Sequence, residues 1–289
     1  MDFLSPSTWE EALAAKSEHP DAVPIMGGTD VMVELNFDRR RPPALLDLTR
    51  VPELTAWGPD GPHLRLGAGV CYTDVIAHLG DRAPALAQAS RSVASPQIRN
   101  RGTVGGNLGG ASPAGDAHPP LLATGAEVEL ASVRGVRRVP IREFYVGFRQ
   151  TARRPDELIA AVLLPAPRGP QAFSKIGPRN AMVISVASFA LALDGDARTV
   201  GTGIGSAGPT PLRAPDAERF LAERFDWDGG TPPAPADVHK FGELVAEAAR
   251  PIDDVRGSAA YRRRSLAVMA RRALAWTATD YREGTARCA

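Results

Sequence analysis

The sequence predicts a mixed fold of the α+β class, divided into two domains near residue 168. Three observations support this prediction. Helical and strand patterns alternate over the first 57 residues, which favours a small α/β lobe. Three prolines within residues 165–170 indicate a linker. Beyond the linker the pattern changes to a strand pair followed by two helices, so we expect a second domain of a different character.

The first 57 residues contain short elements with turn residues between them. Ser7-Thr8-Trp9-Glu10 has the form of a capping box and predicts a helix through Lys16. Strands are expected at residues 23–26 and 45–48, and a helix at 31–35. Residues 57–62 are rich in Gly and Pro and predict a connection. This connection divides a first lobe, residues 1–57, from a second lobe, residues 58–168.

The remaining elements follow from alternation, capping residues and turn residues. In the second lobe we expect strands at 64–67, 127–132, 137–141 and 158–164, and helices at 73–79 and 84–90. Residues 169–289 form the second domain. It should contain a hairpin of strands 185–193 and 199–204 about an Asp194-Gly195-Asp196 turn, then helices at 237–250 and 258–275.

The composition excludes several classes of protein. The 289 residues are 44% apolar and 23% charged, as is usual for a globular chain. Lys plus Arg total 34 and Asp plus Glu total 33, so the net charge of +1 gives no electrostatic case for nucleic acid or an anionic membrane as partner. Cys71 and Cys288 lie far apart, which offers no zinc or iron–sulfur ligand set. Few cysteines, no signal-peptide pattern and no apolar run of membrane-spanning length lead us to expect a cytoplasmic protein.

Two glycine-rich loops are the clearest candidates for binding. The first is Gly27-Gly28-Thr29-Asp30 and the second spans residues 101–110, with Gly105-Gly106-Asn107 at its centre. Neither has the spacing of a Rossmann fingerprint or a P-loop. Glycine nevertheless permits close approach of backbone N–H groups and positive φ, which suits a pyrophosphate. Paired glycines also form ordinary tight turns, and spacing alone does not decide between the two interpretations.

Four further features could take part in binding, and each also has a purely structural explanation. Asp116 could accept hydrogen bonds from a nucleotide ribose or a flavin ring edge, or it could cap the turn before Pro119. Lys175 could meet a phosphate or a flavin carbonyl, or lie on a solvated strand face. His118 has no carboxylate or second ligand at a useful spacing and is expected to be structural. The arginines at 262–264 and 271–272 spread around a helix and predict a solvated or interface face. Hydrolase chemistry is not indicated, because there is no nucleophile elbow and no ligand cluster.

Five motifs, in order along the chain, resemble those of a known family, the flavoprotein medium subunit of molybdenum hydroxylases of the aerobic carbon monoxide dehydrogenase and xanthine dehydrogenase type. Residues 27–32 (GGTDVM) resemble its first glycine loop, and residues 98–108 (IRNRGTVGGNL) are similar almost letter for letter to its second. Residues 154–159 (RPDELI), 173–179 (FSKIGPR) and 251–262 resemble three later elements. The resemblance covers the chain from about Pro24 to Leu274.

The resemblance implies a fold, a cofactor and a set of contacts. The fold would be a two-lobed PCMH-type FAD-binding domain followed by a smaller α+β domain of the carbon monoxide dehydrogenase flavoprotein C-terminal type. The cofactor would be FAD, non-covalent because the first loop carries no His. The implied FAD contacts are Pro24, Ile25, Met26, Gly27, Gly28, Thr29, Asp30, Val31, Thr103, Val104, Gly105, Gly106, Asn107, Asp116, Ile159 and Lys175.

The resemblance also implies that three subunits carry the different cofactors of one complex. A large subunit would hold the molybdenum cofactor, a small subunit would relay electrons through [2Fe–2S] clusters, and the FAD of this chain would pass electrons to an external acceptor, within a heterotrimer or its dimer. No side chain of this chain need act as a catalytic acid or base, and none is expected to bind a metal. Two alternatives remain: a free-standing FAD-dependent oxidase or dehydrogenase, and a flavin-free assembly subunit.

Overall fold

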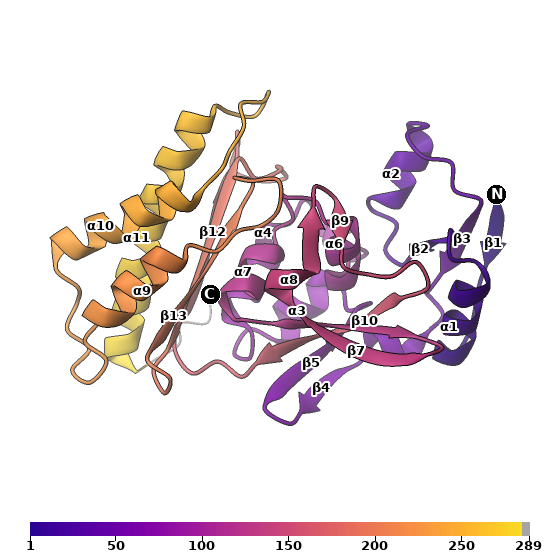
Figure 1. Cartoon of the computed structure of the whole chain (residues 1–289), viewed down its shortest axis with the longest axis horizontal. Helices are drawn as coiled ribbons and strands as arrows, with labels where there is room; N and C mark the ends of the chain where they lie inside the picture. Colours follow the sequence, from indigo (N-terminus) through magenta and orange to yellow (C-terminus); the bar gives the residue numbers. More distant parts are fainter. Residues whose placement is uncertain (285–289) are drawn as a thin grey trace.

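A computed structural model of the chain describes residues 1–284. It has three bodies in a row, as Figure 1 shows: a small N-terminal lobe, a central lobe, and a C-terminal domain with three long helices on its outer side. The predicted α+β fold is confirmed. Cys288 lies outside the described residues. Within the described part, no helix has the length and apolar character needed to cross a bilayer.

The N-terminal lobe is a three-stranded parallel sheet with two helices. Its strand order is β1-β3-β2, and its elements are β1 (Asp2–Leu4), α1 (Trp9–Glu18), β2 (Val23–Ile25), α2 (Val31–Asn36) and β3 (Ala44–Asp47). Thr8 caps α1, because its Oγ1 accepts from the N–H of Glu11, while the Glu11 carboxylate accepts from the N–H of Ser7. The N-cap therefore lies at Thr8, one residue later than the predicted Ser7, and the Glu11 carboxylate accepts from the residue before the cap.

The central lobe is built on a five-stranded antiparallel sheet of order β4-β5-β10-β6-β7. The strands are β4 (Trp57–Asp60), β5 (His63–Gly67), β6 (Glu127–Ser132), β7 (Gly135–Pro140) and β10 (Leu158–Pro165). The central strand β10 is almost wholly apolar and is buried along nearly its whole length, because other strands flank it on both sides and both faces of the sheet are covered. The prediction that residues 57–62 form only a connection was wrong. Trp57–Asp60 pairs with β5 around Gly61, whose φ of 57° suits a tight hairpin.

Short helices and a small strand pair complete the central lobe. They are η1 (Pro52–Thr55), α3 (Tyr72–His78), α4 (Pro84–Ser92), α5 (Pro96–Arg99), α6 (Val104–Gly110), α7 (His118–Ala123), α8 (Ile141–Phe144), β8 (Tyr145–Gly147) and β9 (Gln150–Thr151). One continuous apolar core joins the two lobes, running from Ala12 in α1 to Leu164 in β10. The N-terminal lobe is therefore held to the central sheet by shared core packing.

The C-terminal domain consists of an antiparallel sheet with helices on its outer face. Its elements are β11 (Gln171–Ile176), β12 (Ala187–Asp194), β13 (Thr199–Gly205), α9 (Pro215–Arg224), α10 (Pro235–Ala248) and α11 (Ala259–Glu283). The predicted hairpin is present, since β12 pairs with β13 across the Asp194 turn. A separate apolar core, which includes Phe189, Phe241 and Leu266, lies between this sheet and the helices.

The inner face of the C-terminal sheet packs on α4 and α7 of the central lobe (Figure 1). Two glycines of β13 make this approach possible. A Cβ on Gly201 would lie 1.9 Å from the carbonyl oxygen of Ala123, and a Cβ on Gly203 would lie 2.0 Å from that of Pro119. The backbone of α7 therefore rests directly on the strand. A small apolar cluster, which includes Ala85, Ala89 and Phe173, seals the contact.

Candidate functional site

The two glycine loops predicted from the sequence lie alongside each other. At one end, a Cβ on Gly27 would lie 1.9 Å from the carbonyl oxygen of Arg101, so only glycine permits this contact. At the other end, a Cβ on Gly110 would lie 3.4 Å from Oδ2 of Asp30. The first loop leaves the carboxyl end of β2, and the second loop forms α6 of the central lobe. The site therefore lies at the junction of the two lobes.

The first loop presents unused backbone donors. Within residues 1–284, the N–H groups of Gly27, Gly28, Thr29 and Asp30 donate to no protein acceptor. Gly28 has a φ of 75°, the left-handed conformation that turns successive N–H groups toward one side. Burial raises the pKa of Asp30, and Arg149 partly opposes that shift. The loop is thus shaped to receive an anion by main-chain hydrogen bonds.

The second loop differs from the sequence expectation, because its backbone donors are already used. The N–H of Val104 donates to Val70, that of Gly105 donates to Ala68, and that of Gly106 donates to Oγ1 of Thr103 at 2.9 Å. Gly105 is required for packing, since its Cβ would lie 2.4 Å from the Cβ of Ala68. This loop can therefore contact a ligand through its side chains and through its glycines, which allow close approach because they have no side chain.

A buried ion pair joins the central lobe to the C-terminal domain. Lys175 Nζ lies 2.6 Å from Oδ2 of Asp116 and also donates to the carbonyl oxygen of Ser92. The hydroxyl of Ser185 donates to Oδ1 of the same aspartate at 2.5 Å. Burial raises the pKa of Asp116, whereas the neighbouring Lys175 and Ser185 oppose the rise. The structure thus brings Asp116 and Lys175 together, 59 positions apart in sequence.

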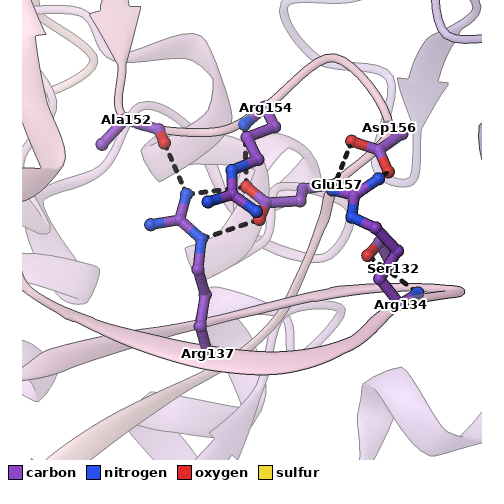
Figure 2. Close-up of polar contacts among 7 residues, drawn as sticks. All are labelled: Ser132, Arg134, Arg137, Ala152, Arg154, Asp156 and Glu157. Carbon is purple, nitrogen blue, oxygen red and sulfur yellow. Dashed lines mark hydrogen bonds and ion pairs between the residues drawn. The ribbon is translucent and has the colours of Figure 1, made fainter.

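Ile159 lies in β10 beside the second loop. Its Cδ1 would be 3.7 Å from a Cβ on Gly109, and the strand has a register shift between Ile159 and Ala161. Figure 2 shows the polar contacts that hold the turn before this strand. Arg137 donates to both carboxylate oxygens of Glu157, at 2.7 and 2.8 Å, and to the carbonyl oxygen of Ala152.

The same turn has two further contacts. The N–H of Arg154 donates to Glu157 at 2.7 Å, and Arg134 pairs with Asp156 (Figure 2). Burial alone would raise the pKa of Glu157, but the hydrogen bonds from Arg137 and Arg154 outweigh it and lower the pKa. These contacts explain the conspicuous Arg-Pro-Asp-Glu segment: it fixes the start of β10, and with it the position of Ile159.

Sequence reasoning missed two tyrosines behind the second loop, Tyr72 and Tyr145, although it had named His118 and Asn107. Tyr72 is buried, and its hydroxyl has no partner among the described residues. Nδ1 of His118 lies 2.5 Å from the hydroxyl of Tyr145, and burial lowers the pKa of His118 to about 3. His118 is fully buried and neutral, in keeping with its expected structural role. Oδ1 of Asn107 is likewise buried without a partner in the part of the chain that the structure describes.

The arginines near the start of α11 do not share one environment. Arg262 is buried and donates to the carbonyl oxygens of Val186 and Ser206, at 2.5 and 2.8 Å, and to Asp254. The prediction of a solvated or interface face was therefore wrong for Arg262. Its neighbours Arg263 and Arg264 are exposed.

Comparison with known proteins identifies the family. The profile described as "FAD binding domain in molybdopterin dehydrogenase" matches residues 1–167. The chain belongs to this family. A second profile, "CO dehydrogenase flavoprotein C-terminal domain", matches residues 172–277. FAD is therefore the cofactor expected at the two loops, and the unused donors of the first loop fit its diphosphate.

Several relatives share this assignment. The chain is 33% identical over 234 residues to "Nicotinate dehydrogenase FAD-subunit" of Eubacterium barkeri, covering 76% of this chain and 79% of the relative. It is 29% identical over 284 residues to "Carbon monoxide dehydrogenase medium chain" of Afipia carboxidovorans, covering 95% of each. A solved structure titled as the Cu,Mo-CO dehydrogenase in its cyanide-inactivated form matches with a TM-score of 0.87 and 28% identity, over 96% of this chain and 98% of that one. The chain is thus a flavoprotein subunit of an oxidoreductase.

Proposed function

We propose that this chain transfers electrons through its FAD, taking them from [2Fe–2S] clusters of a small partner subunit and passing them to an external acceptor. A large subunit with the molybdenum cofactor would carry out substrate oxidation. The observation that supports this most is the row of four unused N–H groups in the first loop, beside a second loop without bulky side chains. Relatives named as subunits or chains of dehydrogenases favour the same organisation.

The roles of individual residues follow from their positions. We propose that Pro24–Val31 and Thr103–Asn107 hold the diphosphate, the first loop by main-chain donors and the second by the side chains of Thr103 and Asn107. Asp116, Ile159 and Lys175 would contact the flavin half. FAD supplies the redox chemistry when bound, while these residues bind it, orient it and set its electrostatic surroundings.

The domain division supports this assignment of roles. We place the boundary at residue 168, between β10, which ends at Pro165, and β11, which begins at Gln171. Lys175 and Ser185 come from the C-terminal domain and Asp116 from the central lobe, so the flavin half would lie where the two domains meet. Cys71 forms no disulfide within residues 1–284, which favours a reducing compartment, and we propose a cytoplasmic location.

Two other functions are less well supported. A free-standing oxidase or dehydrogenase would need a domain to enclose its substrate, and the C-terminal domain instead packs its helices away from the loops (Figure 1). A flavin-free assembly subunit would not need four backbone donors held open in a glycine loop.

The test is substrate turnover by the purified chain and by its complex. Loaded with FAD, the chain alone should not oxidise carbon monoxide, purines or aldehydes, whereas dithionite should reduce its flavin and artificial acceptors should reoxidise it. Turnover of the physiological substrate should require subunits that carry molybdenum and [2Fe–2S] clusters. Steady turnover by the isolated chain, free of molybdenum and iron, would instead show a free-standing oxidase.

A further inference from the structure

Two buried polar atoms face each other behind the second glycine loop. Nε2 of His118 and Oδ1 of Asn107 are both buried, and neither has a hydrogen-bond partner in the part of the chain that the structure describes. A Cβ on Gly115 would lie 2.3 Å from the first atom and 2.8 Å from the second, so both atoms are directed at the same point. Buried polar atoms are nearly always paired in native proteins, and these two are each other's candidate partners.

The contacts of His118 define which of its nitrogens carries the proton. Burial lowers the pKa of His118 to about 3, so the ring is neutral near neutral pH and has one N–H. Its Nδ1 lies 2.5 Å from the hydroxyl of Tyr145, and burial raises the pKa of Tyr145, so this hydroxyl keeps its proton. Oδ1 of Asn107 can only accept a hydrogen bond. All three groups are satisfied when Tyr145 donates to Nδ1 and Nε2 carries the proton.

The amide of Asn107 has an inner and an outer half. Its Oδ1 is buried, whereas its Nδ2 is not among the buried atoms and donates to no protein acceptor within residues 1–284. The carbonyl half therefore points inward, toward His118, and the NH₂ half points out of the loop. Because the N–H groups of Val104, Gly105 and Gly106 already donate within the protein, this NH₂ is a donor that the loop can still direct at a ligand.

We propose that His118 is a positioning residue for FAD: held at Nδ1 by Tyr145, it fixes Oδ1 of Asn107 through its Nε2–H and so directs the amide NH₂ at the diphosphate. The inference rests on the proposed function, because it assumes that Asn107 contacts FAD. It adds two residues, His118 and Tyr145, that lie behind the loop and outside every motif of the sequence. An amide fixed before the cofactor arrives loses less conformational entropy on binding. Glycine at position 115 leaves room for the contact.

The test is a double-mutant cycle on the full-length chain, freed of flavin, with the dissociation constant for FAD as the measurement. Asn107→Ala should weaken FAD binding about tenfold, as expected for loss of one hydrogen bond to a charged group. His118→Leu should weaken it about fivefold in the unaltered chain, yet have no effect on the Asn107→Ala protein, which has no amide to orient. His118→Gln keeps an N–H donor and should restore most of the affinity.

A matched control and a spectrum separate positioning from support of the fold. Leu121→Ala removes a fully buried side chain from α7, the helix that begins at His118, without removing a polar group. Its effect on FAD binding should be the same with and without Asn107. Nitrogen NMR spectra of His118 should show the proton on Nε2.

The possible failures are distinguishable. Equal losses from His118→Leu with and without Asn107 would mean that His118 only supports α7, and the inference would be wrong. Binding by His118→Gln as weak as that by His118→Leu, or a proton on Nδ1, would also overturn it. If Asn107→Ala binds FAD as tightly as the unaltered chain, the inference fails while FAD binding stands. If the unaltered chain binds no FAD at all, the proposed function fails, and the inference fails with it.

Discussion

Gly106 and Gly28 show two different reasons for glycine at the proposed FAD site. Position 28 requires glycine because of its backbone conformation, since its φ is 75°. Gly106 has no such constraint, and the nearest atom to a Cβ placed there is Oγ1 of Thr103 at 2.9 Å. The requirement at Gly106 is therefore for space beside the Thr103 hydroxyl, where the diphosphate is proposed to lie.

Replacing Gly106 with valine tests this requirement. Gly106→Val should place a branched side chain beside Thr103 and weaken FAD binding by at least about tenfold, because crowding of this kind costs roughly 1–3 kcal/mol. Gly80→Val is the control, since a Cβ at Gly80 meets no atom within 4 Å. Flavin content of the purified variants is the measurement. Full flavin content in a soluble Gly106→Val protein would remove this position from the site.

His118 makes stability depend on pH. Its ring is fully buried, and burial lowers its pKa from 6.5 to about 3, with the Ser112 carbonyl opposing slightly. The unfolded chain therefore binds a proton at His118 that the folded chain does not, throughout that interval. The stability from a neutral His118 is complete above pH 6.5 and declines as the pH falls toward 3.

This pH dependence of the free energy of unfolding should disappear when the imidazole of His118 is replaced. Between pH 6.5 and 4.5, the unaltered chain should lose up to about 1.4 kcal/mol of unfolding free energy per pH unit more than His118→Gln does. Urea denaturation at several pH values provides the comparison. Parallel pH profiles for the two proteins would show that His118 is protonated without penalty in the folded state.

At the scale of elements, two arginines of β7 make contrasting ion pairs. Arg137 binds the buried Glu157 through both carboxylate oxygens, whereas the adjacent Arg138 pairs with Asp60, whose side chain is 39% exposed. The first pair also holds the turn before β10 through the N–H of Arg154. A buried carboxylate with several hydrogen bonds contributes more than an exposed one, because its removal leaves several donors without acceptors.

The two carboxylates can be compared directly by truncation. Glu157→Ala should lower the free energy of unfolding by about 2 kcal/mol, because several hydrogen bonds are lost although the remaining Arg137 side chain, 35% exposed, can be hydrated. Asp60→Ala on the neighbouring pair should lower it by less than about 1 kcal/mol. Chemical denaturation at neutral pH measures both values. Equal losses would mean that the network in Figure 2 does not anchor the turn.

Helices and strands whose apolar residues recur with a clear period were predicted well. Elements that depend on packing against distant parts of the chain were not. The alternating residues 127–132 form β6 within the predicted bounds. Residues 104–110 form a helix although four of the seven are glycine, because Thr103 caps it and Gly105 packs against Ala68. Intrinsic propensity gives no sign of that packing. Glycine content and the family motifs both identified the two loops, but no sequence pattern showed that the N–H groups of the second loop would already donate to protein acceptors.

Contacts between distant segments could not be predicted from the sequence either, because they also depend on tertiary packing. Asp116 and Lys175 were separate candidates, each with a structural alternative, and their pairing depends on how the C-terminal sheet docks on the central lobe. Ser185, which also binds Asp116, stood in a predicted strand and carried no signal. The buried position of Arg262 follows from the carbonyl oxygens of Val186 and Ser206, which the chain brings to it only on folding.

At the scale of the whole molecule, domain docking completes the proposed flavin site. The C-terminal sheet reaches α7 because Gly201 and Gly203 leave room for its backbone. That contact places Lys175 and Ser185 against Asp116. Under the proposed assignment, the two domains would act as one cofactor-binding unit, with the diphosphate loops in the first domain and part of the flavin environment in the second.

The central claim is that this unit binds one FAD without a covalent bond. The most direct measurement is acid precipitation of the purified chain, followed by mass analysis of the supernatant and flavin absorbance of the pellet. We predict a yellow supernatant with the mass of FAD, in a one-to-one ratio to protein, and a colourless pellet. Flavin retained on the pellet, FMN in the supernatant, or no flavin in either fraction would contradict the claim.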